Sequence, residues 1–362
     1  MKKKLRVALL FGGKSAEHEI SLISARNIAA AMDKNKYDIV AIGIDKQGRW
    51  HLDEGARLLL GGERTKVEFR DARNAAAIMP GNSATPMVRR SGAAGLTGID
   101  VVFPILHGPF GEDGTVQGLL KLANLPFVGA GVLGSAVGMD KDVMKRLLRD
   151  GGIAIGKFMA FERSDKISFA KVKRALGMPL FVKPANLGSS VGISKVSKPG
   201  QFSAALKEAF RYDNKIVIEE FIAGREIECS VLGNERPIAS LPGEIVVNRD
   251  FYSYDAKYLD AHSSRLEIPA KLPVKVIKEI RQTAIQAYKV LCCQGMGRID
   301  FFVQANGRVL VNEINTIPGF TKISMYPKMW EATGISYSKL IDRLIHLAME
   351  RFRREQRLKS SK

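Results

Sequence analysis

The chain has 362 residues, enough for two or three domains with a substantial core. Hydrophobic residues make up 46% and charged residues 26%, as in an ordinary globular protein, and no apolar run is long enough to span a membrane. The net charge of +19 raises a nucleic-acid-binding hypothesis, but the basic residues are scattered and no aromatic residues interleave with them, so we expect an anionic ligand such as a nucleotide instead.

The beginning of the chain is typical of a parallel α/β domain. An apolar strand is predicted over residues 6–11, followed by a Gly-Gly loop, a helix over residues 21–32 and a second strand over residues 37–44. Glu17 lies where the helix begins. Its carboxylate is either a favourable charge at a helix N-terminus or a site acid at the carboxyl edge of the sheet.

Neither export nor disulfide bonding is indicated. The lysines at positions 2–4 are typical of the start of a signal peptide, but the apolar run after them ends at Phe11 and gives way to glycines. The three cysteines, Cys229, Cys292 and Cys293, lack metal-ligand spacing, and we expect the adjacent pair to be buried thiols on a helix. We therefore predict a cytoplasmic protein.

Residues 46–98 are rich in glycine, arginine and alanine and show weak periodicity, so we predict a surface insertion with short strands. The next predicted strand, residues 99–106, ends at His107 and a run of turn residues. A histidine at the carboxyl end of a strand favours a functional role, with loop hydrogen bonding as the alternative.

Residues 129–134 match the G-x-G-x-x-G pattern of dinucleotide-binding proteins. A true fingerprint needs an acid about 20 residues further on, at the end of the next strand. No acid occupies that place, so a nicotinamide-binding protein is a weaker alternative. Lys141 lies at the start of the next predicted helix, residues 139–149, and is either a phosphate partner or a solvated lysine.

Two later segments can bind a nucleotide. An apolar strand ends in Lys183 and leads into a small-residue loop, residues 184–192, whose backbone N–H groups and hydroxyls can lie against phosphates. The polar link at residues 219–226 joins two predicted strands, and its acids and backbone can hold an adenine and a ribose. The alternatives are a flexible hairpin and an ordinary polar connection.

The C-terminal half contains a predicted lid and two core helices. Residues 248–265 are polar, aromatic and irregular, which is typical of a lid or an Ω-loop. Residues 273–292 and 336–349 each carry an apolar stripe at helical spacing, so we predict two helices that pack on the core.

The most informative segment is a hairpin predicted between residues 297 and 315. Its two apolar runs flank an Asn-Gly pair, which is typical of a two-residue turn. That turn places Asp300 opposite Glu313. It also places Arg298 opposite Asn315 on the same face, because side chains alternate along a strand.

Two facing carboxylates repel each other, so a cation between Asp300 and Glu313 would stabilise the pair. Oxygen ligands suit Mg²⁺ or Mn²⁺ better than zinc, and Mg²⁺ held by carboxylates usually completes its shell with substrate phosphates. The alternative is a solvated face neutralised by Arg298. We favour the metal site because the opposite face is already apolar. The apolar residues of that face are Ile299, Phe301, Val303 and Leu310.

A turn containing Pro318 and Gly319 follows the hairpin. Such a turn can present backbone N–H groups beside the predicted metal. We therefore expect an anion or oxyanion site there.

Taken in this order, the motifs resemble the ATP-grasp superfamily and, more narrowly, the D-alanine–D-alanine ligase family. The similarity covers nearly the whole chain. The most specific motifs are residues 11–22, residues 107–115 and the tyrosine-rich segment that ends at residues 256–258.

The resemblance implies a fold that combines α/β and α+β parts in a three-domain ATP-grasp architecture. Residues 1–138 are expected to form an N-terminal parallel α/β domain that includes the insertion. Residues 139–218 would form the central ATP-grasp subdomain. Residues 219–362 would form the C-terminal subdomain, which contains the metal site and the lid loop.

The resemblance also implies a role for each site residue. The residues expected to bind ATP are Lys141, Lys183, Ser190, Glu219, Glu220, Ile222, Glu226, Lys257 and Asn312. The residues expected to bind two Mg²⁺ or Mn²⁺ ions are Asp300, Glu313 and Asn315. The residues expected to bind the amino acids are Glu17, His107, Arg298, Gly319, Ser324 and Met325. The residues expected to act in catalysis are Glu17, Ser189, Tyr258, Arg298 and Gly319.

The implied reaction joins two D-alanines to D-alanyl-D-alanine through a D-alanyl phosphate intermediate, releases ADP and phosphate, and supplies peptidoglycan precursor synthesis. The lid residues Lys257 and Tyr258 are similar to those of dipeptide-forming members, and a ligase that makes D-alanyl-D-lactate is the alternative. The family implies a homodimer. We expect neither a nucleic-acid partner nor a membrane partner.

Overall fold

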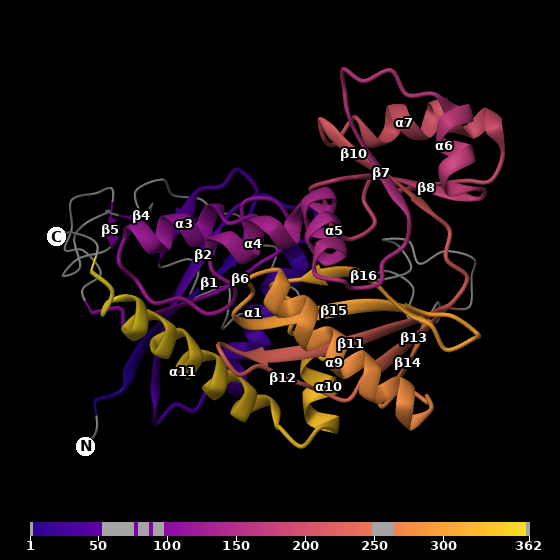
Figure 1. Ribbon diagram of the computed structural model, residues 1–362. Helices are drawn as coiled ribbons and strands as arrows, with labels where there is room; N and C mark the ends of the chain where they lie inside the picture. The colour runs from indigo at the N-terminus through magenta and orange to yellow at the C-terminus, as the bar shows by residue number, and fades with distance from the viewer. Residues whose placement is uncertain (1–2, 53–75, 79–86, 90–97, 248–263, 360–362) are drawn as a thin grey trace.

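The computed structural model describes residues 3–52, 76–78, 87–89, 98–247 and 264–359 (Figure 1). The described residues form three larger sheets with helices packed against them, which confirms the predicted combination of α/β and α+β parts. Most of the predicted insertion and nearly all of the predicted lid lie outside these ranges. No helix in the described part of the chain is long and apolar enough to cross a membrane.

The first sheet is built from the N-terminal part of the chain. Its strands, in spatial order, are β3 (Trp50–His51), β2 (Tyr37–Ile44), β1 (Leu5–Gly12) and β6 (Val101–Leu106). The central strand β1 is parallel to both β2 and β6. Alternate residues of β1 pack against α1 (His18–Ala31) and α11 (Tyr337–Glu355) on one side and against α3 (Thr115–Leu122) on the other. The strand is therefore continuously apolar because both of its faces are covered.

The second sheet projects from the rest of the molecule, at the upper right of Figure 1. Its strands, in spatial order, are β7 (Phe158–Glu162), β10 (Lys215–Glu220), β8 (Leu180–Pro184) and β9 (Ser194–Val196), all antiparallel to their neighbours. The helices that share its core are α6 (Phe169–Leu176) and α7 (Phe202–Ala209), which follows the 3₁₀ turn η2 (Pro199–Gln201). This core contains no residue of the other two sheets.

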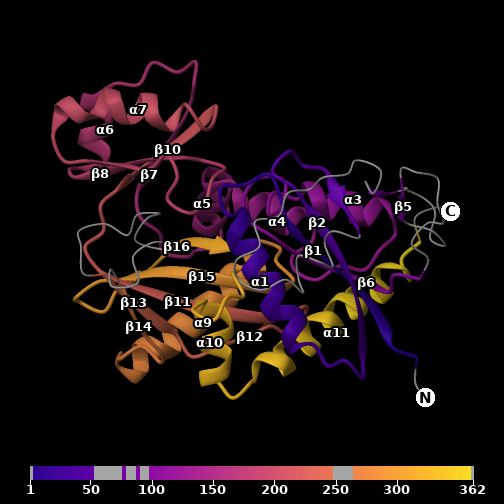
Figure 2. The same cartoon turned by 180° about the vertical axis from the view of Figure 1, so that it is seen from behind.

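The third sheet contains the predicted hairpin. Its strands, in spatial order, are β14 (Ser264–Glu267), β13 (Gly243–Val247), β11 (Arg225–Gly233), β15 (Gly295–Val303) and β16 (Val309–Asn315), and β12 (Ile238–Ala239) pairs with β11. The helices that share its main core are α4 (Val132–Met139), α5 (Lys141–Asp150) and α9 (Val274–Val290). The remaining elements are α10 (Met325–Ala332) and the short pair β4 (Ala76–Ile78) and β5 (Met87–Arg89). Seen from behind, α1 and α11 lie side by side between the first and third sheets (Figure 2).

The turn of the β15–β16 hairpin differs from the prediction. The N–H of Gln304 donates to the carbonyl oxygen of Arg308 at 3.0 Å, so these two residues close the loop. The loop between them consists of Ala305, Asn306 and Gly307. The predicted two-residue turn is therefore wrong, and the pairing next to the turn is shifted by one residue.

A β-bulge restores the predicted pairing further along the hairpin. The register shifts next to Asp300, where Asn312 of β16 has no partner on β15. Beyond the bulge, Asp300 faces Glu313 and Arg298 faces Asn315, as predicted. The longer turn and the extra residue thus offset each other.

The bulge also changes the apolar face of the hairpin. Val309 and Val311 join Ile299 and Phe301 in the core of the third sheet, whereas Leu310 does not. Leu310 pairs instead with Phe302. The prediction for Leu310 is wrong because a one-residue shift of register turns a side chain to the other face.

The prediction for the adjacent cysteines is also only partly right. Cys229 and Cys293 are buried free thiols, and burial raises the pKa of Cys229 to about 12. Cys292 is exposed. The helix α9 ends at Val290, and Cys292 adopts a left-handed conformation with φ of 54° that turns it out of the core.

Candidate active site

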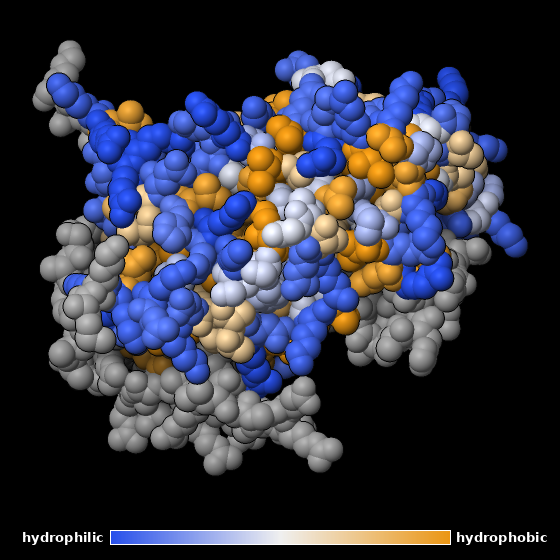
Figure 3. All heavy atoms as spheres, turned by 90° about the horizontal axis from the view of Figure 1, so that it is seen from below, coloured by the Kyte–Doolittle hydropathy of each residue, from blue (hydrophilic) through white to orange (hydrophobic). Residues whose placement is uncertain are grey.

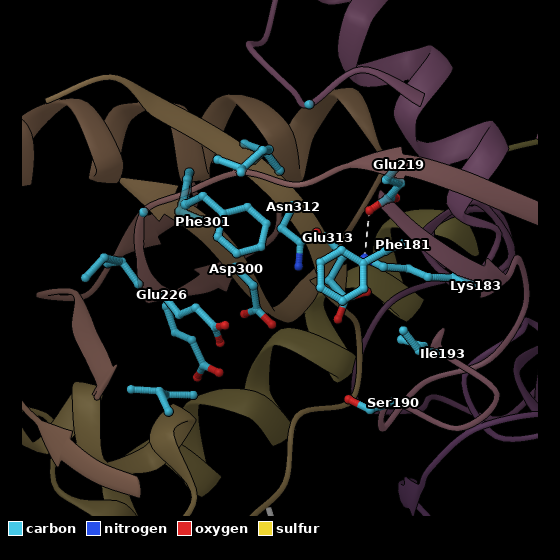
Figure 4. A pocket seen from close by; sticks show the side chains of 18 of the residues that line it. Phe181, Lys183, Ser190, Ile193, Glu219, Glu226, Asp300, Phe301, Asn312 and Glu313 are labelled. Atoms are coloured by element: carbon cyan, nitrogen blue, oxygen red, sulfur yellow. Dashed lines mark hydrogen bonds and ion pairs between the residues drawn. The ribbon is translucent and has the colours of Figure 1, made fainter. Parts of the chain in front are cut away.

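A cavity of about 390 Å³ lies between the second and third sheets, and its size suits a nucleotide (Figure 4). The carboxylates of Glu226, Asp300 and Glu313 point into one space, with the side chain of Asn312 beside them (Figure 4). The charged and apolar groups of its wall come from α5, the loop after β8, the β10–β11 link and the hairpin. Those residues include Lys141, Lys145, Phe181, Lys183, Ser189, Ser190, Glu219, Glu220, Ile222, Glu226, Asp300, Asn312 and Glu313.

Two lysines share Glu219 at one end of this cavity, and Lys145 is buried whereas the side chain of Lys183 is 12% exposed. Nζ of Lys183 lies 2.6 Å from one carboxylate oxygen of Glu219, and Nζ of Lys145 lies 3.1 Å from the other. Burial opposes ionisation of Glu219, but the two ammonium groups outweigh it and lower its pKa to about 2. Burial lowers the pKa of Lys145, whereas Glu219 and Glu313 outweigh burial and raise that of Lys183. Two lysines thus share a single ionised carboxylate in this cluster.

Lys141 connects the small-residue loop to the hairpin. Its Nζ donates to the carbonyl oxygen of Leu187 at 2.6 Å and lies 3.4 Å from a carboxylate oxygen of Glu313. Its backbone N–H donates to the carbonyl oxygen of Ala185 at 3.0 Å. The N-terminus of α5 thus holds the base of the loop beside the acidic face of the hairpin.

Arg298 holds the other carboxylate of the hairpin. Its Nε and Nη2 donate to the two oxygens of Asp300 at 2.8 and 2.7 Å, a bidentate pair. Its Nε also lies 3.0 Å from a carboxylate oxygen of Glu228 on β11. Burial opposes the charge of Arg298, but Asp300 and Glu228 outweigh burial and raise its pKa well above the ordinary value.

The hairpin residues fit a hard divalent cation. Asp300, Glu313 and Asn315 supply only oxygen donors from the same face of the sheet, and cationic groups already lie against both carboxylates. The Oδ1 atom of Asn315 accepts a hydrogen bond from the N–H of Ile317 at 3.1 Å, which fixes the amide. In the described ranges, no group of three or more His, Cys, Asp and Glu side chains is arranged to hold a metal. A metal here would therefore also need oxygens from a bound ligand.

A second group of titratable residues lies at the carboxyl end of the first sheet. Gly12 and Leu106 end neighbouring parallel strands, and Glu17 and His107 follow those two ends. Burial lowers the pKa of His107, although the carboxylate of Glu17 opposes the shift. The ring is therefore neutral at pH 7. Its Nε2 atom is buried and has no hydrogen-bond partner among the described residues.

Glu112 belongs to the same group. One of its carboxylate oxygens accepts a hydrogen bond from the N–H of Gly108 at 2.6 Å. Burial, and next the nearby Glu17, raise the pKa of Glu112 to about 8. The charge of Arg298 acts on both Glu112 and His107. The guanidinium therefore lies between the acidic hairpin and this second group.

The loop from Gly319 to Ser324 is fixed by several polar side chains. The carbonyl oxygen of Phe320 accepts from Nδ2 of Asn27 at 3.1 Å and from the hydroxyl of Tyr337 at 2.7 Å. The Oγ atom of Ser324 accepts from the N–H of Thr321 at 2.9 Å. A Cβ atom at Gly319 would lie 2.9 Å from that same Oγ, so a larger residue there would push the Ser324 hydroxyl away. No described group accepts a hydrogen bond from the N–H of Gly319.

Ser189 and Ser190 adopt an unusual backbone conformation. Their φ values are 51° and 61°, in the left-handed region that residues other than Gly and Asn seldom adopt. Such strain concentrates where a loop contacts a ligand. Both residues line the cavity.

The predicted residues therefore fall into two neighbouring groups. Every predicted ATP-binding residue within the described ranges lines the cavity. The side chain of Met325 is buried against Ile245 and Met329, so only its backbone is left for a ligand. Lys257 and Tyr258 lie outside the described residues.

Sequence reasoning missed three site residues. Lys145 lies one helical turn after Lys141, and that spacing was an available signal. Glu112 lies within the turn-rich motif after His107, but its burial is a tertiary property. Glu228 faces Asp300 across the β11–β15 pair. The sequence contains no signal for that pairing because the two strands are distant along the chain.

Comparisons with known proteins identify relatives over the whole length. A family model described as D-ala D-ala ligase N-terminus matches residues 6–130, and one described as D-ala D-ala ligase C-terminus matches residues 147–346. The D-alanine--D-alanine ligase of Oceanobacillus iheyensis is 52% identical over 365 residues, covering 100% of this chain and 99% of the relative. The solved structure of the D-alanine-D-alanine ligase from Coxiella burnetii is similar with a TM-score of 0.87 and 44% identity, covering 98% of this chain and 96% of that one. The VanG D-Ala:D-Ser ligase from Enterococcus faecalis is similar with a TM-score of 0.85 and 36% identity, covering 96% of this chain and 100% of that one.

Proposed function

We infer that this chain, which belongs to the D-alanine–D-alanine ligase family, joins two D-alanines to D-alanyl-D-alanine and converts ATP to ADP and phosphate. One observation carries the inference at the level of the site. Arg298 lies between a nucleotide-sized cavity edged by Asp300 and Glu313 and the group formed by Glu17 and His107. A phosphate donor on one side and a small amino acid on the other would meet at this guanidinium.

ATP is proposed to bind in the cavity between the second and third sheets. Lys141 and Lys183 would contact its phosphates, and the loop with Ser190 would lie over them. When Lys183 turns to a phosphate, Lys145 remains to balance the charge of Glu219. The carboxylate of Glu219 can then accept a hydrogen bond from the adenine. The residues proposed to complete the adenine and ribose site are Glu220, Ile222, Glu226 and Asn312.

Two Mg²⁺ or Mn²⁺ ions are proposed to be held by Asp300, Glu313 and Asn315 together with phosphate oxygens. When bound, these ions would neutralise negative charge on the phosphoryl group in transit. The ammonium group of Lys141 lies against Glu313, and the guanidinium group of Arg298 lies against Asp300. Both groups would turn toward the substrates when the ions bind these carboxylates.

The first D-alanine is proposed to bind with its ammonium at Glu17 and its carboxylate toward Arg298. An oxygen of that carboxylate attacks the γ-phosphorus of ATP, and the bond from this phosphorus to the β-phosphate oxygen breaks. ADP departs, and the D-alanine now carries the phosphoryl group as an acyl phosphate. The neutral amine of the second D-alanine then attacks the acyl carbon, loses a proton, and phosphate departs. Arg298 and the N–H of Gly319 would stabilise the oxyanion formed in this step.

The remaining residues are proposed to position the substrates and exclude water. His107, neutral and buried, would contact the first D-alanine. Ser324 and the backbone of Met325 would orient the second. Ser189, with Tyr258 and Lys257 of the lid, would close over the acyl phosphate and protect it from hydrolysis.

We also propose the wider setting of the enzyme. It would act in the cytoplasm, where ATP is made, and would supply a peptidoglycan precursor. It would form a homodimer, and its three units would divide near residues 138 and 218.

The test supplies ATP, Mg²⁺ and D-alanine to the purified protein and identifies products by mass spectrometry. We expect D-alanyl-D-alanine with one phosphate released per dipeptide, and no product from L-alanine. Parallel reactions with D-lactate or D-serine as second substrate separate this activity from that of related ligases. Absence of the dipeptide would refute the proposal.

A matched pair of variants ties the activity to the site. Glu313→Gln removes a carboxylate of the acidic hairpin and should abolish measurable synthesis. Glu279→Gln removes an exposed carboxylate from α9 and should leave synthesis unchanged. Equal activity of the two variants would show that the hairpin is not the reacting site.

A further inference from the structure

Glu228 lies in line with the two carboxylates of the hairpin. The register places Glu228 of β11 opposite Asp300 of β15, which in turn faces Glu313 of β16. The three carboxylates therefore form one row across the sheet. The exposed fraction of the side chain is 7% for Glu228, 16% for Asp300 and 32% for Glu313, so Glu228 is the least accessible of the three to a ligand.

Arg298 is shared between Asp300 and Glu228. Asp300 accepts from both Nε and Nη2, and Glu228 lies 3.0 Å from Nε. No described residue accepts from Nη1, which leaves that nitrogen for a substrate oxygen. In the proposed reaction, however, Asp300 also binds a divalent cation, and the cation competes with the guanidinium for the same carboxylate oxygens.

We propose that Glu228 is a positioning residue that holds the guanidinium of Arg298 at the reacting carboxyl group while Asp300 serves a metal ion. The proposal rests on the proposed function, because the substrate carboxyl comes from it. Without a second carboxylate, the guanidinium of Arg298 would be repelled by the metal ion. Its remaining partner would be Asp300, whose two carboxylate oxygens the metal ion also binds. Glu228 supplies that second carboxylate from the wall of the cavity, where its side chain is only 7% exposed and water screens the ion pair with Arg298 little.

Two other possible roles of Glu228 predict different results. If Glu228 were a metal ligand, its loss would weaken the dependence of the rate on Mg²⁺. If Glu228 were a purely structural group, its loss would lower the melting temperature and leave the chemistry of the folded enzyme intact. If Glu228 is a positioning residue, its loss lowers kcat while the affinities for ATP and Mg²⁺ stay the same.

The first test is Glu228→Gln, which keeps the size and removes the charge. We expect kcat to fall about 10- to 100-fold, because a small misplacement of a group at the reacting atoms can cost up to about 100-fold in rate. The KM for ATP and the Mg²⁺ concentration at half-maximal rate should not change. If this variant does not fold, Glu228→Asp serves instead, because it keeps the charge but withdraws it by one methylene from Nε.

The matched control is Asp45→Asn. Asp45 is also a buried carboxylate that pairs with an arginine, at 2.6 Å from Nε of Arg49; it directly follows strand β2 and does not line the cavity. This variant should lose stability without losing kcat. An unchanged kcat in Glu228→Gln, or a raised Mg²⁺ requirement in it, would overturn the proposal.

The second test is a double-mutant cycle with Arg298→Gln. If Glu228 acts through Arg298, then adding Glu228→Gln to Arg298→Gln should cost little further kcat, whereas an undiminished second loss would overturn the proposal. Thermal melts with Mg²⁺ and ADP supply a readout independent of turnover, and Glu228→Gln should retain the full ligand-induced shift. A wild-type protein that makes no dipeptide refutes the proposed function, whereas an active wild type with an equally active Glu228→Gln refutes only this inference.

Discussion

Glu112 is a site residue whose protonation depends strongly on its surroundings. Its carboxyl group is buried beside Glu17, and burial raises its pKa from the ordinary value of 4.5 to about 8. It is therefore protonated at pH 7 in the ligand-free protein and can donate as well as accept a hydrogen bond. A cationic substrate ammonium near Glu17 would lower that pKa again.

This shift predicts how stability depends on pH. Between about pH 4.5 and 8 the folded protein keeps a proton on Glu112 that the unfolded chain releases, so the contribution of Glu112 to stability falls as pH rises through this window. Glu112→Gln cannot ionise, so its stability relative to wild type should rise by a few kcal/mol at most between pH 5 and pH 8. Urea denaturation at several pH values measures the difference. A difference that does not depend on pH, as expected for the exposed control Glu279→Gln, would contradict the prediction.

Glu219 is the opposite case. Burial opposes its charge, but Lys145 and Lys183 outweigh burial and lower its pKa to about 2. The stabilisation is therefore present above the ordinary pKa of 4.5 and is lost as pH falls toward 2.

We accordingly predict that Glu219→Gln lowers the free energy of unfolding by about 3–5 kcal/mol at pH 7, because it leaves the buried Lys145 and the largely buried Lys183 without their counterion. Near pH 3 the difference from wild type should shrink. Urea denaturation of both proteins at the two pH values measures it. A variant as stable as wild type at pH 7 would show that water, rather than Glu219, balances the lysines.

At the level of the elements, the β-bulge at Asn312 is the feature that shapes the cavity wall. The extra residue places the side chains of Asn312 and Glu313 in the same space, as Figure 4 shows. The carbonyl oxygen of Asn312 also accepts from Nζ of Lys145 at 3.3 Å. The bulge thus connects the hairpin to the lysine pair on Glu219.

Deleting Asn312 is predicted to leave the acidic pair intact. The register next to the turn, continued without a bulge, brings Glu313 opposite Asp300, so the Mg²⁺ requirement should be preserved. The KM for ATP should rise about tenfold, as for one lost hydrogen bond near 1.4 kcal/mol. Asn312→Ala keeps the bulge and its carbonyl oxygen, so it should raise the KM less. Steady-state kinetics with both variants decide this, and a deletion that loses its Mg²⁺ response would show that the bulge itself sets the register.

At the level of the whole molecule, the hydrophobic cores cross the predicted boundaries between units. The core of the first sheet includes Phe320, Tyr326 and Trp330 as well as several residues of α11. The core of the third sheet includes Met144 and Leu148 of α5. The second sheet, by contrast, is packed only by its own helices.

These cores predict which fragments fold alone. A fragment of residues 1–138 lacks α11 and should remain largely unfolded, because one face of its sheet would be exposed. A fragment of residues 157–221 contains the whole core of the second sheet and should show cooperative thermal unfolding by circular dichroism. Cooperative unfolding of the first fragment would contradict the prediction.

Local patterns determined much of this protein from the sequence alone. Periodicity located β1, β2, β6 and α9 to within a few residues and the start of α11 to within one, although α11 continues six residues beyond its predicted end, and the strand ends located Glu17 and His107. These features depend on neighbours close along the chain, whose side chains repeat with the period of a helix or a strand. The pairing of Asp300 with Glu313 was also predicted correctly, although through a turn that was wrong by one residue.

Only the tertiary structure decided the partners of the charged groups. Lys145 meets Glu219, and Glu228 meets Arg298, across distances along the chain that no local pattern encodes. The bulge at Asn312 and the packing of α11 on the first sheet are likewise set by contacts between distant segments. A strand's sequence states which residues alternate, but its register and its neighbours depend on which arrangement buries the most apolar surface and leaves no charge without a partner.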